Sequence, residues 1–262
     1  MGSESNDQHQ HEYQELLEAG YGWRARIGFL SPGLVDETVT RQFYRMAPPG
    51  VTMVRTSLGV TALTTDEISD ALGRAEAAAR TLATAKPDCI ILGGSPTVVI
   101  GGLGYDEKLR EVIENASGIP SSAAQTAAVE AFRLLGVTRL AVATPFPEPF
   151  PTMLKEFLQQ SGFEVLASDS LPVDYRDLTM TPLRAGYDLA RRTFEAAGTA
   201  QAIYFPGAPF PVADLIDPLE RELNTTVVSS MQATLWKGLR MAGATDVEIR
   251  GYGRLLRTAL NA

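Results

Sequence analysis

Histidine and cysteine are scarce in this sequence. The two histidines, His9 and His11, lie in a polar N-terminal segment, and Cys89 is the single cysteine. A Ser-His-Asp or Cys-His triad needs a histidine within hydrogen-bond reach of its nucleophile, and a Cys/His zinc site needs several nitrogen or sulfur ligands. The sequence therefore excludes both, and we expect no bound metal. An enzyme of this composition works with carboxylates, hydroxyls and backbone donors.

Long hydrophobic runs and an excess of basic residues are also absent. No stretch reaches the ~18 consecutive apolar residues of a membrane helix, and the N-terminus lacks the basic-then-apolar layout of a signal peptide. The net charge of −8 and the pI near 4.9 disfavour nucleic acid, whose phosphates bind basic surfaces. One cysteine allows no internal disulfide. We therefore expect a cytoplasmic protein without membrane or nucleic-acid partners, and the sequence leaves homo-oligomer formation open.

The chain is long enough for one large domain or two lobes, with 262 residues of which 45% are hydrophobic. Residues 1–22 differ from the rest because they are polar and rich in Gln and Glu. Such a segment cannot bury enough surface to offset the entropy of ordering. We predict a flexible N-terminal arm over residues 1–22, with a short helix at Glu12–Ala19.

Short apolar runs alternate with segments of helical periodicity from Arg24 onward, which indicates βα units and a mainly parallel sheet. The predicted strands are Ala25–Leu30, Val51–Ser57, Cys89–Leu92, Arg139–Ala143, Glu164–Ala167, Ala202–Phe205 and Thr226–Val228. The predicted helices are Thr65–Ala85, Ala123–Leu135, Thr152–Gln160, Arg184–Ala197 and Met231–Ala242. The last four helices each end at or near a glycine suited to the left-handed C-cap position. The fold class is therefore α/β.

Small-residue turns that contain proline follow four of the predicted strands. They hold Ser31-Pro32-Gly33, Gly93-Gly94-Ser95-Pro96, Thr144-Pro145-Phe146-Pro147 and Pro206-Gly207-Ala208-Pro209. Ligands of open α/β sheets bind outside the carboxyl ends of the strands, so these turns together mark a candidate site. Each turn, taken alone, is also typical of the turns that commonly end a strand. No phosphate-binding fingerprint accompanies them, and we predict no cofactor.

Several segments, in their order and spacing, resemble the aspartate/glutamate racemase superfamily over about residues 24–262. They are the turn after Cys89–Leu92, the segment from Ile119 to Ala127 with its helix, the run 135–144, Val227–Ser230 before the helix with Trp236, and the closing Gly251–Leu256. Within the superfamily they are most similar to the branch that holds arylmalonate decarboxylase and maleate cis-trans isomerase. The resemblance implies two pseudo-symmetric α/β lobes with an active cleft between them: residues 23–125 plus 229–262, and residues 126–228.

Two catalytic thiols of the superfamily are missing from this chain. In the racemases, one cysteine from each lobe exchanges a proton with the substrate, and the turns that would carry them hold Gly93 and Gly207. Cys89 does not replace them, because four residues of strand separate it from Gly93, on the order of 13 Å. Phe146 stands where the resemblance leads us to expect tyrosine. Racemisation by two thiols and isomerisation through a thiol adduct are therefore excluded.

The resemblance places the catalytic candidates Ser95, Asp174 and Tyr175 at the cleft. Ser95 and the backbone N–H groups around it would bind a carboxylate and stabilise an enediolate. Asp174 and Tyr175 fall on a loop that closes over the substrate in relatives, where a buried Asp174 would serve as acid or base. The alternative is a solvated loop with a surface pair between Asp174 and Arg176. The expected substrate contacts are Ser31, Pro32, Gly93, Gly94, Thr144, Phe146, Pro206, Gly207 and Ala208.

Three functions remain open at this point. The first is a cofactor-independent lyase or isomerase acting at the carbon next to a carboxylate of a small organic acid, decarboxylase-like, with a hydroxyl, a carboxyl or water as proton source. The second is a hydrolase or hydratase on the same scaffold, in which water occupies the space that the thiols would fill. The third is a catalytically silent carboxylate-binding protein, because losing both thiols is what inactivation would look like.

Overall fold

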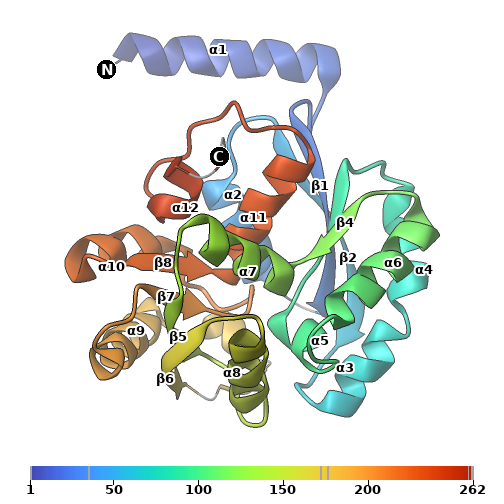
Figure 1. Ribbon diagram of the computed structural model, residues 1–262. Coiled ribbons are helices and arrows are strands. Elements are labelled where there is room, and N and C mark those ends of the chain that lie inside the picture. The colour runs from blue at the N-terminus through green and yellow to red at the C-terminus, as the bar shows by residue number, and fades with distance from the viewer. Residues whose placement is uncertain (1, 35, 172, 176, 259, 261–262) are drawn as a thin grey trace.

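Eight strands form two separate sheets in the computed structural model, which describes residues 2–34, 36–171, 173–175, 177–258 and 260. The first sheet has the order β2-β1-β3-β4 and the second β6-β5-β7-β8, and every pairing is parallel (Figure 1). The strands are β1 (Ala25–Gly33), β2 (Val51–Val60), β3 (Cys89–Leu92), β4 (Ser121–Ala123), β5 (Arg139–Thr144), β6 (Glu164–Ser170), β7 (Ala202–Phe205) and β8 (Thr226–Ser229). The strand order is the same in both sheets, which confirms the prediction of an α/β fold built from two similar halves.

Helices flank both sheets (Figure 1). They are α1 (Gly2–Ala19), α2 (Glu37–Met46), α3 (Thr65–Leu72), α4 (Ala75–Ala83), α5 (Ser95–Val99), α6 (Tyr105–Ser117), α7 (Ala124–Leu134), α8 (Phe150–Gln160), α9 (Leu183–Ala197), α10 (Ile216–Leu223), α11 (Ser230–Met241) and α12 (Gly253–Thr258). Helices α7 and α11 follow the last strand of each sheet and pack against each other. The two halves therefore meet along this helix pair.

The seven predicted strands are all present, and an eighth, β4, was not predicted. Strands β3 and β7 are buried at every position, as expected for continuous apolar runs between covering helices. Strand β4 escaped prediction because it has three residues and begins with Ser121 and Ser122, which give no apolar run. It pairs only with β3, so it forms the edge of the first sheet.

One predicted helix, Thr65–Ala85, is divided into α3 and α4. The break falls at Gly73 and Arg74, where glycine has low helix propensity. The guanidinium group of Arg74 donates hydrogen bonds of 2.9 and 2.6 Å to the carbonyl oxygen of Leu58 on β2. This contact with the neighbouring strand fixes the chain at the break. The hydrophobic periodicity of the sequence does not indicate it.

The N-terminal segment forms one helix, α1, which is longer than the predicted Glu12–Ala19 and lies along the outside of the first half (Figure 1). Met1 lies outside the described residues. Within the described part of the chain, no helix is both long and apolar enough to cross a membrane.

Candidate active site between the two sheets

A pocket lies where the carboxyl ends of strands from both sheets converge. Its walls come from the ends of β1, β3, β5 and β7, from α2, from the segment after β2 and from the loop after β6. Its volume is about 30 Å³. The lining residues are Phe29, Ser31, Pro32, Gly33, Asp36, Val39, Val60, Leu63, Ile68, Gly94, Pro96, Thr97, Phe146, Tyr175, Gly207, Ala208 and Pro209.

Phenylalanine rings occupy the space above Gly93 and Gly207. A Cβ atom at Gly93 would overlap the ring of Phe29, and one at Gly207 would lie 2.7 Å from Cζ of Phe146. Both contacts would be closer than a normal van der Waals contact, so no side chain fits at Gly93 or Gly207 while the two rings stay in place. Gly207 also has φ +93°, a conformation that side-chain-bearing residues rarely adopt.

The single thiol of the chain does not line this pocket. Cys89 is buried in β3, where its Sγ contacts the carbonyl oxygen of Gly238 on α11 at 3.7 Å. Burial raises the pKa of Cys89 to about 12. The thiol is therefore kept protonated and acts as a small core side chain.

Helix α2 of the first half holds the turn after β7 of the second half. Gln42 donates a 2.8 Å hydrogen bond to the carbonyl oxygen of Ala208 and accepts bonds of 3.0 Å from the N–H groups of Val212 and Ala213. Thr38 donates a 2.6 Å bond to the carbonyl oxygen of Pro209. These buried bonds fix the Gly207–Pro209 wall of the pocket relative to the first half.

A buried carboxyl group lies in the pocket wall. Asp36 precedes α2, yet its side chain does not cap the helix and instead accepts a hydrogen bond from the Ser31 hydroxyl at the end of β1. The Arg55 guanidinium of β2 forms an ion pair with the other carboxyl oxygen. Burial raises the pKa of Asp36, and the contacts with Ser31 and Arg55 oppose that rise.

Tyr175 reaches from the loop after β6 into the first half. Its hydroxyl oxygen lies 2.5 Å from where a Cβ atom of Gly33 would be, so glycine is required there. Burial raises the pKa of Tyr175, and the nearby charge of Asp36 raises it further. The phenol therefore stays neutral and can donate a hydrogen bond.

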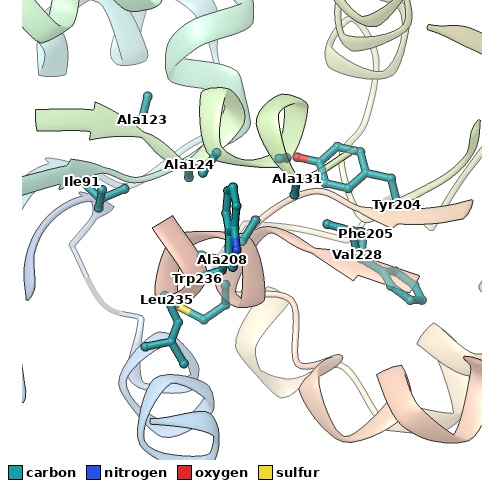
Figure 2. Close-up of a cluster of buried hydrophobic side chains, with 14 of the residues drawn as sticks. Ile91, Ala123, Ala124, Ala131, Tyr204, Phe205, Ala208, Val228, Leu235 and Trp236 are labelled. Carbon is teal, nitrogen blue, oxygen red and sulfur yellow. The ribbon is translucent and has the colours of Figure 1, made fainter. Parts of the chain in front are cut away.

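Ser95 is not in the lining of this pocket and takes part in a buried polar network between the halves. Its hydroxyl lies 3.2 Å from the hydroxyl of Tyr204 on β7, which donates a 2.9 Å hydrogen bond to Oε1 of Gln125 on α7. The Tyr204 hydroxyl points toward α7, and the ring of Phe205 lies on the other side of β7 (Figure 2). All three polar residues are buried. The network links α5, β7 and α7 behind the site.

Comparison with known proteins agrees with this geometry. The sequence model for arylmalonate decarboxylase matches residues 36–256. The chain belongs to the arylmalonate decarboxylase family. Arylmalonate decarboxylase from Bordetella bronchiseptica is 28% identical over 240 residues, which cover 87% of this chain and 95% of the relative. Maleate isomerase from Nocardia farcinica is 26% identical over 183 residues, covering 67% and 72%.

The fold of a solved family member is also close to that of this chain. A liganded double mutant of arylmalonate decarboxylase superposes with a TM-score of 0.81 at 26% identity and covers 88% of this chain and 98% of its own. Together these relatives confirm the resemblance to the racemase superfamily and its decarboxylase and isomerase branch. They also confirm the prediction of a cofactor-independent lyase or isomerase, with the reaction itself left open.

The pocket brings together seven of the residues predicted for the site in this family member: Ser31, Pro32, Gly94, Phe146, Tyr175, Gly207 and Ala208. Ser95, Gly93, Thr144, Pro206 and Asp174 are not in its lining. The N–H group of Gly93 is used by the carbonyl oxygen of Leu30, and the Thr144 hydroxyl accepts a 3.2 Å bond from the N–H of Phe146. Asp174 is exposed, and Arg176, its partner in the alternative interpretation, lies outside the described residues.

Sequence reasoning missed Asp36, Thr97 and the apolar wall from β2 and α3. A signal for α2 was present, because Val39, Phe43 and Met46 recur at helical spacing after the acidic pair Asp36 and Glu37. That pattern predicts a helix with an N-capping aspartate. It gives no indication that the carboxyl group turns into a pocket. Among the described residues, no group of three His, Cys, Asp or Glu side chains is placed to hold a metal ion.

Proposed function

We propose that this protein decarboxylates a small malonate-type dicarboxylic acid by forming an enediolate, without a thiol. The observation that carries the proposal is the convergence of Gly94, Gly207 and Ala208 from both halves at one pocket in a chain of this family. Backbone N–H groups at such a position can bind one carboxylate and stabilise the negative charge that develops when the other leaves.

The N–H groups of these three residues are available to a ligand. In the described part of the chain, no protein acceptor takes the N–H of Gly94, Gly207 or Ala208. A donor aimed at a developing oxyanion lowers an activation barrier by about 3 kcal/mol. The predicted cradle is therefore smaller than the sequence suggested, because the N–H of Gly93 belongs to the sheet.

The remaining walls favour an apolar substituent on the substrate. The apolar side chains that line the pocket are Phe29, Val39, Val60, Leu63, Ile68 and Phe146. An apolar environment also promotes decarboxylation, because a carboxylate taken out of water loses the hydration that stabilises its charge, while carbon dioxide is neutral. The α-carbon of the substrate would therefore carry an aryl or alkyl group.

Two other reactions have less support. A hydrolase or hydratase needs room for an activated water where the thiols would be, and Phe29 and Phe146 occupy that space. Isomerisation through a thiol adduct needs a thiol in the pocket, and Cys89 is in the core of β3. We keep a cytoplasmic location and a small carboxylate as the ligand class as proposals, on the acidic composition and the family relationship.

A proton NMR time course in deuterated buffer tests the reaction. The purified protein is mixed with phenylmalonate, methyl(phenyl)malonate, alkylmalonates and maleate. We expect a monocarboxylate with one deuterium at the α-carbon from at least one malonate. Incorporation of labelled oxygen from water would identify a hydrolase instead. Thermal stabilisation by these acids with no change in any of them would identify a binding protein.

Two glycine variants connect that turnover to the pocket. Gly94→Ala places a Cβ atom 2.8 Å from Pro32 in the pocket, at φ +84°. Gly102→Ala imposes similar backbone strain at φ +72°, with nothing within 4 Å of the new atom. We expect G94A to lose turnover and G102A to keep it. Equal loss in both variants would show that backbone strain, and not the pocket, controls activity.

A further inference from the structure

We propose that Asp36 is the acid that protonates the α-carbon, and that Ser31 and Arg55 position its carboxyl group. The inference rests on the proposed function, because it names the proton source which that reaction requires in place of a thiol. Among the described residues that line the pocket, Asp36 is the one carboxylic acid, and Tyr175 is the one other side chain with an ionisable group.

The Asp36 side chain has an unusual position for a residue that precedes a helix. An aspartate before a helix normally accepts a hydrogen bond from an N–H group of the first turn. Asp36 makes no such bond to α2 and turns inward, where its side chain is 1% exposed. A buried carboxyl group turned away from the bond it would ordinarily make requires another reason for its position. Proton transfer to a ligand in the pocket provides that reason.

The two neighbouring strands β1 and β2 hold the carboxyl group of Asp36. Ser31 binds one oxygen from β1, and Arg55 faces the other from β2. Glu37 on α2 and Tyr175 from the loop after β6 are the other ionisable groups that act on Asp36 or respond to it. Burial raises the pKa of Asp36, so the carboxyl group keeps its proton to a higher pH than an exposed aspartate does.

The proposed step is balanced in atoms and charge. The bond between the α-carbon and the departing carboxylate breaks, its electron pair forms the enediolate at the Gly94 and Ala208 wall, and carbon dioxide leaves. The Asp36 carboxyl group then gives its proton to the α-carbon, forming the new C–H bond. The Asp36 carboxylate that remains lies beside Arg55, and a proton from water restores the acid. The proton reaches the substrate from one face only, so a prochiral malonate should give one enantiomer.

The decisive experiment compares Asp36→Asn with the wild type on a prochiral substrate, methyl(phenyl)malonate, by NMR and chiral chromatography. We expect D36N to slow turnover about 100-fold, the usual contribution of a general acid, and to give racemic residual product. Asp66→Asn is the matched control, because it makes the same change at an exposed aspartate on α3. D66N should keep both rate and enantiomeric excess. Full rate and full enantiomeric excess in D36N would overturn the inference while leaving the proposed function intact.

A second variant tests the role of Asp36 even if D36N fails to fold. Ser31→Ala removes the hydrogen bond that lowers the pKa of Asp36. The acid form should then persist to higher pH, and the alkaline limb of the kcat profile should move upward relative to the wild type. An unmoved limb would count against Asp36 as the donor. Absence of wild-type turnover with every acid would refute the proposed function itself.

Discussion

The hydroxyl groups of Ser95 and Tyr204 lie 3.2 Å apart in the buried contact between the two halves of the molecule. Ser95 comes from the turn after β3, and Tyr204 comes from β7 of the other sheet. Tyr204 passes its own hydrogen to Gln125, so Ser95 can donate to Tyr204. The serine predicted to act on the substrate is therefore also a structural link behind the site.

A double-mutant cycle measures this link. Tyr204→Phe leaves both Ser95 and Gln125 without their partner, so we expect the free energy of unfolding to fall by roughly 1–3 kcal/mol. Ser95→Ala leaves the bond to Gln125 intact and should cost about 1 kcal/mol. Urea unfolding of both variants and of the double variant should give a coupling of at least about 0.5 kcal/mol. Additive losses would mean that the two hydroxyls do not interact.

The same variants separate two roles of Ser95. A similar loss of kcat/KM in S95A and Y204F would assign Ser95 a positioning role through the network. A much larger loss confined to S95A would keep the prediction that Ser95 acts on the substrate.

Two residues of α2 that contact the other half should differ sharply in their contribution to the free energy of unfolding. Gln42→Ala removes three buried hydrogen bonds to the turn after β7, and we expect it to cost roughly 3 kcal/mol or more. Arg45→Ala removes an ion pair with Asp214 at the surface, which should cost much less because both groups are solvated. Thermal and urea unfolding give both values. Equal costs would contradict the view that Gln42 fixes the turn.

Restoring a thiol to the first half should require a second change. Gly93→Cys forces the new side chain into the ring of Phe29, and overpacking of this kind costs about 1–3 kcal/mol. Phe29→Ala creates a cavity and is destabilising alone. We expect the double variant to be more stable than the sum of the single effects predicts, because the thiol enters the space that the ring leaves. A purely additive result would show that Phe29 does not exclude the thiol.

The buried carboxyl group predicts a particular pH dependence of stability. The pKa of Asp36 is raised above its ordinary value of 3.8, chiefly by burial. Between the two values the folded state binds more protons than the unfolded state, so this group lowers the free energy of unfolding as pH rises. D36N should therefore gain stability relative to the wild type as pH rises above 3.8.

A surface aspartate provides the contrast for that measurement. The hydrogen bond from Arg184 lowers the pKa of Asp188, so its contribution is present at neutral pH and is lost as pH falls. Asp188→Asn should lose stability relative to the wild type as pH rises toward 3.8, below the interval in which D36N gains it. Curves of the same sign for D36N and D188N would contradict the assignment for Asp36.

The sequence predicts the sheet well because buried parallel strands are continuous apolar runs. Strands β3 and β7 have the predicted bounds, Cys89–Leu92 and Ala202–Phe205. Strand β4 differs because Ser121 and Ser122 are polar residues that the fold buries. Their sequence pattern therefore gives no indication of a buried strand. Local pattern therefore predicts strands that are covered on both faces more reliably than it predicts short polar edge strands.

The candidate site is less accessible to sequence reasoning than the sheet. The turns at the strand ends predict where the pocket lies, because parallel strands bring their carboxyl ends together. The grouping of Asp36 with Ser31 and Arg55 depends on the contact of β1 with β2 and on the path of the chain into α2. Likewise, the commitment of Ser95 to Tyr204 depends on how the two halves meet. Such contacts join residues far apart in the sequence, and a single chain gives no pattern for them.

The two ring-over-glycine contacts constrain the order of evolutionary change. A lineage that regained a thiol at Gly93 or Gly207 would pass through an overpacked intermediate unless Phe29 or Phe146 changed to a smaller residue first. Phenylalanine and glycine at these positions are therefore expected to change together within each half, independently of the other half.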